Sequence, residues 1–309
     1  MSTFSLILPY GAHTSTIFAT AKPGMSSTTS DLEGLRRRLD EIDDRLQDLL
    51  IQRAEIVAMV PASKKEENLP ALQPAREAKI IRRLVGRHHG AFPVATLVRM
   101  WREMLAATVR MQSPFSVAVF VSGDRQGLWD LARDHYGSNT PMTPYDAVGP
   151  ILRAVAGGES SVGVLPFPQP REPDPWWPCL LSDGPRVIAR LPFGAGGNAR
   201  DGEAGALAIG CGALQESGFD RTLVVVECAT GITRARMLKP LSAAGLVCTF
   251  FAPCLRQAAM NLIELEGFVP ISDRRIEILR MEMGAALHKL WMLGSYAVPL
   301  PPHFFAIKG

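Results

Sequence analysis

Two cations fall on one face of a long apolar helix that is predicted near the start of the sequence. Arg53 and Lys64 are eleven residues apart, which at about 100° per residue places them within roughly 20° of one another and about 16 Å apart along the axis. Arg36 lies about 26 Å from Arg53 and about 100° round the same helix. One small ligand could contact Arg53 and Lys64 together, whereas Arg36 could join them only from the antiparallel helix of a second copy.

Polar residues of two further predicted helices extend this set. Arg76 and Glu77 lie early in the second helix, and Thr108 and Gln112 are four residues apart in the third, hence on one face. Each of them alone could be an ordinary solvated surface residue. Together, several cations, one carboxylate and a Thr/Gln pair on an apolar bundle describe a pocket for a small dianion.

Hydrophobic periodicity predicts the elements that position these residues. Residues 31–112 follow a helical pattern without a strand. The pattern predicts one long helix that contains Pro61, a second from Pro74 to about His88, and a third that begins near Pro93 and ends before residue 114. A proline inside a helix removes a hydrogen bond and usually kinks the axis. Three helices of such unequal length leave an apolar stripe uncovered, which favours pairing with a second copy.

The character of the sequence changes at residue 115. Strands are predicted at 116–121, 160–167 and 185–193, with a helix through Leu128 and Leu131. The stretches QPREPDPWWP and GAGGNARDGEAG between them are typical of loops or poor order. From Asp220 onward the pattern gives a βαββαβ order, with strands at 222–227, 246–251, 260–267 and 289–296 and helices at 233–245 and 272–284. This order is the ferredoxin-like arrangement.

The composition of the chain indicates which kinds of binding partner and which cell compartment to expect. The net charge of +3 comes from mixed signs along the chain, which gives no electrostatic case for nucleic acid or a membrane surface as the main partner. No apolar run approaches the roughly 18 residues of a membrane helix. Five scattered cysteines without a C-x-x-C pair favour a reduced, cytoplasmic chain without a metal site, and His88–His89 has no third ligand nearby. Residues 1–28 are expected to be a disordered tail, with Met25 as an alternative start.

The segment LRRRLDEIDDRLQDLLIQRAEIVAMVPASK, followed by PAREAKIIRRL and TLVRMWREMLAATVRMQ, resembles the all-helical class of chorismate mutase, in particular the mutase part of bifunctional chorismate mutase–prephenate dehydratases. The resemblance covers about residues 31–113 and runs without a gap from Arg36 to Glu77. It implies an all-α three-helix domain that forms an intertwined homodimer. It also implies the small-molecule substrate chorismate, with no cofactor and no metal.

The resemblance also implies which residues act. Arg36 would bind a carboxylate in the partner's site, Arg53 would hold a carboxylate within its own chain, and Lys64 would hydrogen-bond the ether oxygen. The implied catalytic set is Arg36, Arg53, Lys64, Glu77 and Gln112. Gln112 would share the ether oxygen with Lys64, and Glu77 would hold the ring hydroxyl. The implied substrate-binding set adds Gln73, Arg76 and Thr108, with Gln73 standing where the family usually has an acidic residue.

The remainder of the chain resembles the same bifunctional enzyme in altered form. SVAVFVSGDRQGLWDLARDHYG is similar to the start of a prephenate dehydratase domain without its Gly-Pro-x-Gly signature. AGALAIG stands where that family has the Thr-Arg-Phe motif with its catalytic threonine, so loss of dehydratase activity is expected. Residues 220–309 resemble a regulatory ACT domain, with LWMLGSY as the best match, although ATGITRARML and APCLRQAAM replace the two phenylalanine-binding motifs.

These comparisons predict a multidomain chain with a tail (1–28), a chorismate mutase domain (29–114), a truncated α/β dehydratase-like lobe (115–213) and an α+β ACT-like domain (214–309). Two functional hypotheses follow. In the first, the protein is an isomerase, a chorismate mutase of phenylalanine and tyrosine biosynthesis. In the second, it is a catalytically inactive relative that senses an amino acid or binds a biosynthetic partner. The intact polar set favours the first hypothesis, and Pro61 favours the second.

Overall fold

A computed structural model describes residues 27–305, except 67–69, 122, 124–125, 171, 182, 196, 199, 201–204, 230–232 and 258. The side chains of residues 27–30 and 62–66 also lie outside the description. The chain divides into two units, residues 1–55 and 56–309, and each unit is described by itself. Most of the predicted tail, residues 1–26, lies outside the described residues.

The three predicted helices are present. They are α1 (Ser27–Glu66), α2 (Pro74–Arg87) and α3 (Val94–Gln112). Helix α1 continues through Pro61 to Glu66. Pro74 occupies the first turn of α2, where its missing N–H would have no helical partner in any case.

The apolar side chains of α1 are exposed in the single chain. In the first unit, eight of them are between 47% and 59% exposed: Leu32, Leu35, Leu39, Ile42, Leu46, Leu49, Leu50 and Ile51. Most recur at three- and four-residue steps and therefore form a stripe along the helix. We call these eight residues the α1 stripe.

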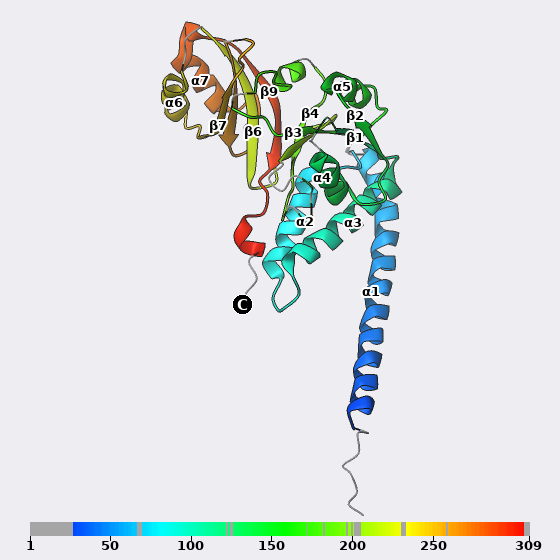
Figure 1. Ribbon diagram of the computed structural model, residues 1–309. Coiled ribbons are helices and arrows are strands. Elements are labelled where there is room, and N and C mark those ends of the chain that lie inside the picture. The colour runs from blue at the N-terminus through cyan, green and yellow to red at the C-terminus, as the bar shows by residue number, and fades with distance from the viewer. Residues whose placement is uncertain are drawn as a thin grey trace, which may run out of the picture. The chain divides into compact units, whose positions relative to one another are not determined.

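The second unit contains one nine-stranded sheet with the order β2-β1-β3-β5-β4-β9-β6-β8-β7 (Figure 1). Its first five strands are β1 (Val117–Phe120), β2 (Met142–Tyr145), β3 (Val162–Pro166), β4 (Arg186–Leu191) and β5 (Ala206–Gly210). Helices α4 (Gly127–Tyr136) and α5 (Val148–Ala156) lie between these strands in the sequence. The structure confirms the predicted strands β1, β3 and β4 and helix α4, whereas the sequence pattern missed β2, β5 and α5.

The C-terminal part has the predicted βαββαβ order. Its elements are β6 (Asp220–Cys228), α6 (Arg234–Ala243), β7 (Cys248–Pro253), β8 (Met260–Glu266), α7 (Arg274–Met283) and β9 (Leu287–Ala297). The four strands are antiparallel in the order β9-β6-β8-β7. Both helices pack on one face of these strands (Figure 1), because Met237, Leu241, Ile276 and Leu279 share a buried cluster with Val224 and other strand residues.

Two strands far apart in the sequence join the halves of the sheet. Strand β4 pairs in parallel with β9 at Val187 and Gly294. Gly294 has φ +146°, and a Cβ there would collide with the backbone of Val187, so this close approach requires glycine. The predicted loop QPREPDPWWP ends in the core, because Trp176 and Trp177 are 5% and 1% exposed.

Candidate active site

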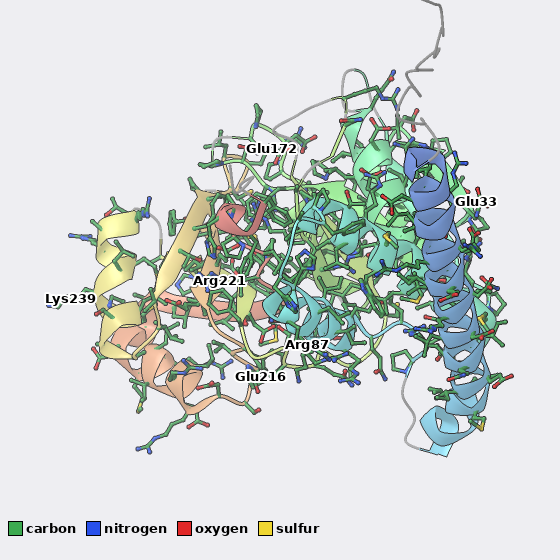
Figure 2. All side chains as sticks on the ribbon, turned by 90° about the horizontal axis from the view of Figure 1, so that it is seen from below. Glu33, Arg87, Glu172, Glu216, Arg221 and Lys239 are labelled. Carbon is green, nitrogen blue, oxygen red and sulfur yellow. The ribbon has the colours of Figure 1, made fainter. Side chains whose placement is uncertain are left out.

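Helix α1 carries the first two predicted site residues, and both belong to the first unit. Arg36 forms an ion pair with Glu33 at 3.9 Å between Nη1 and Oε2, and both side chains are about two-thirds exposed. Figure 2 shows Glu33 projecting from the N-terminal part of α1. Such an exposed pair contributes little free energy and leaves the Arg36 side chain adaptable. Arg53 is half-buried, and this burial lowers the pKa of its guanidinium from the ordinary value.

The beginning of α2 carries three more of the predicted residues. Gln73 is the N-cap, and its side chain makes no capping hydrogen bond. It lines a cavity of about 30 Å³ between the start of α2 and β9, which has room for little more than water. Arg76 is exposed, and it forms no ion pair with any residue that the structure describes. Arg76 could therefore bind an anionic ligand without first breaking an ion pair.

Glu77 is buried against a cation that the sequence analysis missed. Its Oε2 accepts a hydrogen bond from Nη1 of Arg102 on α3 at 3.0 Å, and the two side chains are 12% and 6% exposed. Burial lowers the pKa of Arg102, and the carboxylate of Glu77 offsets part of this effect. Because each partner neutralises the other, the two charges can remain in a largely apolar region.

Two aromatic residues of α4 border this ion pair. Burial and the charge of Arg102 hold the pKa of His135 well below its usual range, so the ring is neutral. Burial, followed by the charge of Glu77, raises the pKa of Tyr136 far above its ordinary value. The side chains of His135 and Tyr136 are therefore both uncharged at neutral pH beside the Glu77–Arg102 pair.

Thr108 and Gln112 lie one turn apart on α3, as predicted. The Thr108 hydroxyl donates to the carbonyl oxygen of Leu105 at 2.8 Å, and the Gln112 amide donates to the carbonyl oxygen of Thr108 at 2.9 Å. Side chains of this kind often satisfy the backbone of their own helix when no ligand is bound. A ligand would have to exchange these local bonds for its own.

The second unit thus brings five of the eight predicted residues onto two helices that pack together, namely Gln73, Arg76, Glu77, Thr108 and Gln112. Arg36 and Arg53 are described only within the first unit. Lys64 lies in α1, but its side chain is outside the described residues. Assembly of all eight around one ligand therefore stays a prediction.

Arg102 could not have been found from spacing. It lies in the middle of α3, 25 residues from Glu77, and reads in the sequence as one of several arginines on a polar-apolar helix. A weak signal exists, because Arg102 is separated by three and four residues from the buried Val98 and Leu105 and therefore shares their face.

The two adjacent histidines contact only nearby backbone atoms among the described residues. His88 and His89 contact the backbone oxygens of Phe92 and Arg87, at 2.7 and 3.0 Å. Among the described residues, no group of three His, Cys, Asp or Glu side chains could hold a metal ion. No described helix combines the length and apolar character needed to cross a membrane.

Comparison with known proteins shows which protein family part of the chain resembles. The family model of chorismate mutase type II matches residues 35–113. Bifunctional chorismate mutase/prephenate dehydratases of Stutzerimonas stutzeri and Pseudomonas aeruginosa are 26% and 27% identical over 145 and 140 residues. These matches cover 45% and 44% of this chain and 40% and 38% of the relatives. The chain thus spans about two fifths of the length of these curated relatives.

Alignments to solved structures cover more of this chain, at TM-scores below 0.5. A protein described as "GqqA- a novel type of quorum quenching acylases" has a TM-score of 0.44 at 16% identity and covers 61% of this chain and 96% of its own. Prephenate dehydratase from Streptococcus mutans has a TM-score of 0.44 at 13% identity and covers 60% and 100%. At such identities the function of neither protein transfers to this chain. Residues 35–113 nevertheless match the chorismate mutase type II family, and the curated relatives that the chain matches are bifunctional chorismate mutase/prephenate dehydratases.

Proposed function

We propose that the protein is a chorismate mutase, an isomerase that rearranges chorismate to prephenate in aromatic amino acid biosynthesis. The observation that carries this proposal is the family match over residues 35–113, a segment that contains all eight predicted site residues. Arg76, Glu77, Thr108 and Gln112 lie on the packed helices α2 and α3, and Gln73 is the N-cap of α2, which supports their action on one ligand.

The chemistry needs binding groups only. Conversion of chorismate to prephenate is a unimolecular rearrangement, so that neither a nucleophile nor a redox group takes part. Arg36 and Arg53 would clamp the two carboxylates in the folded conformer, which supplies orientation. Lys64 and Gln112 would donate to the ether oxygen, where negative charge grows as its bond to carbon breaks. Glu77 would accept a hydrogen bond from the ring hydroxyl, with Gln73, Arg76 and Thr108 in support.

We further propose that two copies of the chain form the active enzyme. The α1 stripe supports this, because eight large apolar side chains on one helix remain about half-exposed in the single chain. A partner's antiparallel α1 would cover the stripe. It would also deliver Arg36 to the site that contains Arg53 and Lys64. The homodimer would then have two sites, each built from both chains.

Residues 115–305, which contain the sheet and which we call the sheet part, are proposed to lack dehydratase activity. The segment AGALAIG, which stands where the resemblance implies a catalytic threonine, forms β5 from Ala206 to Gly210. Strand β5 is buried between β3 and β4 and offers no hydroxyl group. The names dehydratase-like lobe and ACT-like domain for 115–213 and 214–309 stay predictions, as does the mutase domain boundary at 114.

We place the protein in the reducing cytoplasm. All five cysteines, at positions 179, 211, 228, 248 and 254, are free. Burial raises the pKa of the Cys228 thiol to about 11. A thiol in that state is a small apolar core group rather than a reactive one.

A second candidate function is that of a catalytically inactive regulatory or interaction protein. Pro61 favours it, because this residue lies in α1 between Arg53 and Lys64 and removes one helical hydrogen bond there. In this case the polar set would be present but would not converge on chorismate.

Product analysis separates the two candidates. Purified full-length protein is incubated with chorismate, and in a parallel reaction with prephenate, and the products are identified by NMR. The mutase proposal predicts that prephenate accumulates in the first reaction and that no phenylpyruvate forms in the second beyond the protein-free control. Unchanged chorismate would support the inactive relative, and protein-dependent phenylpyruvate would show that the dehydratase assignment is wrong.

A further inference from the structure

The pair of helices α2 and α3 shares its core with the sheet part of the chain. One buried cluster contains Ala78, Ile81 and Val85 of α2 and Val98 and Leu105 of α3. The same cluster contains three residues from beyond residue 190, namely Phe193, Ala297 and Leu300. Each of these side chains is at most 9% exposed. The apolar face of the helix pair is therefore completed by residues outside the segment that matches the mutase family.

Helix α2 is also joined to the sheet part by hydrogen bonds. Arg82 donates to the carbonyl oxygen and the hydroxyl of Ser217 at 3.2 and 2.9 Å, and to the carbonyl oxygens of Phe219 and Val298 at 2.7 and 2.8 Å. Asp220 in turn accepts a hydrogen bond from the Ser217 hydroxyl at 2.6 Å. One side chain thus connects α2 to the turn before β6 and to the end of β9.

Helix α3 is fixed against α4 in the same way. Arg99 donates to Asp134 at 2.8 Å, and Glu103 accepts a hydrogen bond from the backbone N–H of Ser138 at 3.0 Å. Gly137 has φ +89°, and a Cβ there would lie 2.8 Å from the Cβ of Ala106. The end of α4 therefore lies directly on α3, and relative movement of the two would break buried contacts.

Arg102 contacts both Glu77 and Phe193. Its guanidinium is 4.8 Å from the centre of the Phe193 ring, and Tyr136 and His135 of α4 lie close enough to affect, and be affected by, its charge. Its Nη1 holds the Glu77 carboxylate at 3.0 Å. A carboxylate can accept several hydrogen bonds, so this bond is compatible with a further one from a ligand. The position of Glu77 is therefore set from the sheet side of α3.

We propose that the sheet part is a working component of the mutase site, and that Arg102 is a positioning residue that holds the Glu77 carboxylate for the substrate. This inference rests on the proposed function. It gives the sheet part a role that needs no dehydratase chemistry: Phe193 packs against Arg102, and Arg102 hydrogen-bonds Glu77.

The test compares three substitutions at two positions of the chain. Arg102→Met removes the charge at similar length, Arg102→Lys keeps it, and Arg99→Met is the matched control, because Arg99 also crosses from α3 to α4 but its side chain is 46% exposed and pairs with Asp134 instead. Loss of a charge-assisted hydrogen bond should lower kcat/KM for chorismate by about ten- to a hundredfold in Arg102→Met. We expect partial recovery in Arg102→Lys and less than about a twofold change in Arg99→Met.

The double variant decides whether Arg102 acts through Glu77. If it does, adding Arg102→Met to Glu77→Gln should cause no further loss of kcat/KM. A loss equal to the product of the two single effects would overturn the proposal, as would an Arg102→Met enzyme with unchanged kcat and KM. If Arg102→Met does not fold, Phe193→Leu, which removes the ring beneath the guanidinium, takes its place with the same expected non-additivity.

A readout that is independent of turnover separates this inference from the proposed function. Absence of turnover in the wild-type chain would refute the mutase. Amide hydrogen exchange over residues 74–87 would still report how firmly α2 is fixed in place. We expect faster exchange there in Arg102→Met than in Arg99→Met, and equal exchange in the two variants would refute the positioning role even in a protein without mutase activity.

Discussion

Glu77 on α2 and Arg102 on α3 form a hydrogen-bonded ion pair at 3.0 Å between side chains that are 12% and 6% exposed. The family resemblance implies that Glu77 binds the substrate, whereas no sequence motif pointed to Arg102. The pair places a proposed site residue at the boundary between the mutase segment and the sheet. The packing of the sheet against α2 and α3 is therefore expected to affect the proposed site.

The pH dependence of stability should reveal the neutral His135 beside this pair. Its folded-state pKa lies well below the ordinary 6.5, so the unfolded chain takes up a proton below about pH 6.5 while the folded chain does not. Folding stability should thus fall as pH drops from 6.5, by up to about 1.4 kcal/mol per pH unit from this group. Urea unfolding at pH 7.5, 6.5 and 5.5 measures it.

The control for this prediction is His135→Gln, which cannot titrate. The free energy of unfolding of the wild-type chain should decrease more steeply below pH 6.5 than that of the variant. Parallel curves for the two proteins would mean that His135 takes up a proton as readily in the folded chain as in the unfolded chain, and would contradict the lowered pKa described for its buried ring.

Arg82 should contribute more to stability than the arginine beside it. Arg82→Met would leave the carbonyl oxygens of Phe219 and Val298 without this donor, and we expect a loss of about 1.5 to 3 kcal/mol in the free energy of unfolding. Arg83 is the neighbouring residue on α2 and is exposed, so Arg83→Met should change stability by less than about 0.5 kcal/mol. Equal effects in chemical denaturation would show that Arg82 does not fix α2 to the sheet.

The sequence predicted most of the helices and much of the sheet because their signals are local. The three-helix segment follows from residue spacing and from Pro74, and the βαββαβ order of the last 90 residues follows from strongly apolar strands. Strand β2 was missed because Met142–Tyr145 contains a proline and lies at the edge of the sheet, with no buried residue. Its signal is therefore weak.

Contacts between distant residues could not be predicted in this way. The pairing of Val187 with Gly294 joins two segments more than 100 residues apart, and neither residue indicates its partner. The same holds for Arg102 and Glu77, whose pairing depends on how α2 packs on α3. Sequence reasoning thus named five candidate residues that the structure places on two packed helices, but not the residue that holds one of them.

A mixing experiment should reveal whether sites are shared between two chains. Arg36→Ala and Lys64→Ala should each lower kcat/KM by about ten- to a hundredfold, since each removes a charged contact to the substrate. If Arg36 serves the partner's site, exchange of subunits between the two variants creates a heterodimer with one intact site. Activity should then rise well above that of either parent.

The matched control for this mixing experiment is the combination of Arg53→Ala with Lys64→Ala. Both residues would serve the site of their own chain, so every site in that heterodimer carries one lesion and activity should stay low. Recovery in this control, or its absence in the Arg36 and Lys64 mixture after mass spectrometry has confirmed exchange, would contradict the shared site.

The most direct test of the central claim is the steady-state turnover of chorismate by the purified full-length chain in the presence of a metal chelator. We expect prephenate formation well above the uncatalysed rate. We also expect a loss of about tenfold or more in kcat/KM in Arg53→Met and near wild-type turnover in Lys79→Met, which removes an exposed cation of α2. Turnover no faster than the protein-free reaction, or equal turnover in Arg53→Met and the wild type, would contradict the assignment of this chain as a chorismate mutase.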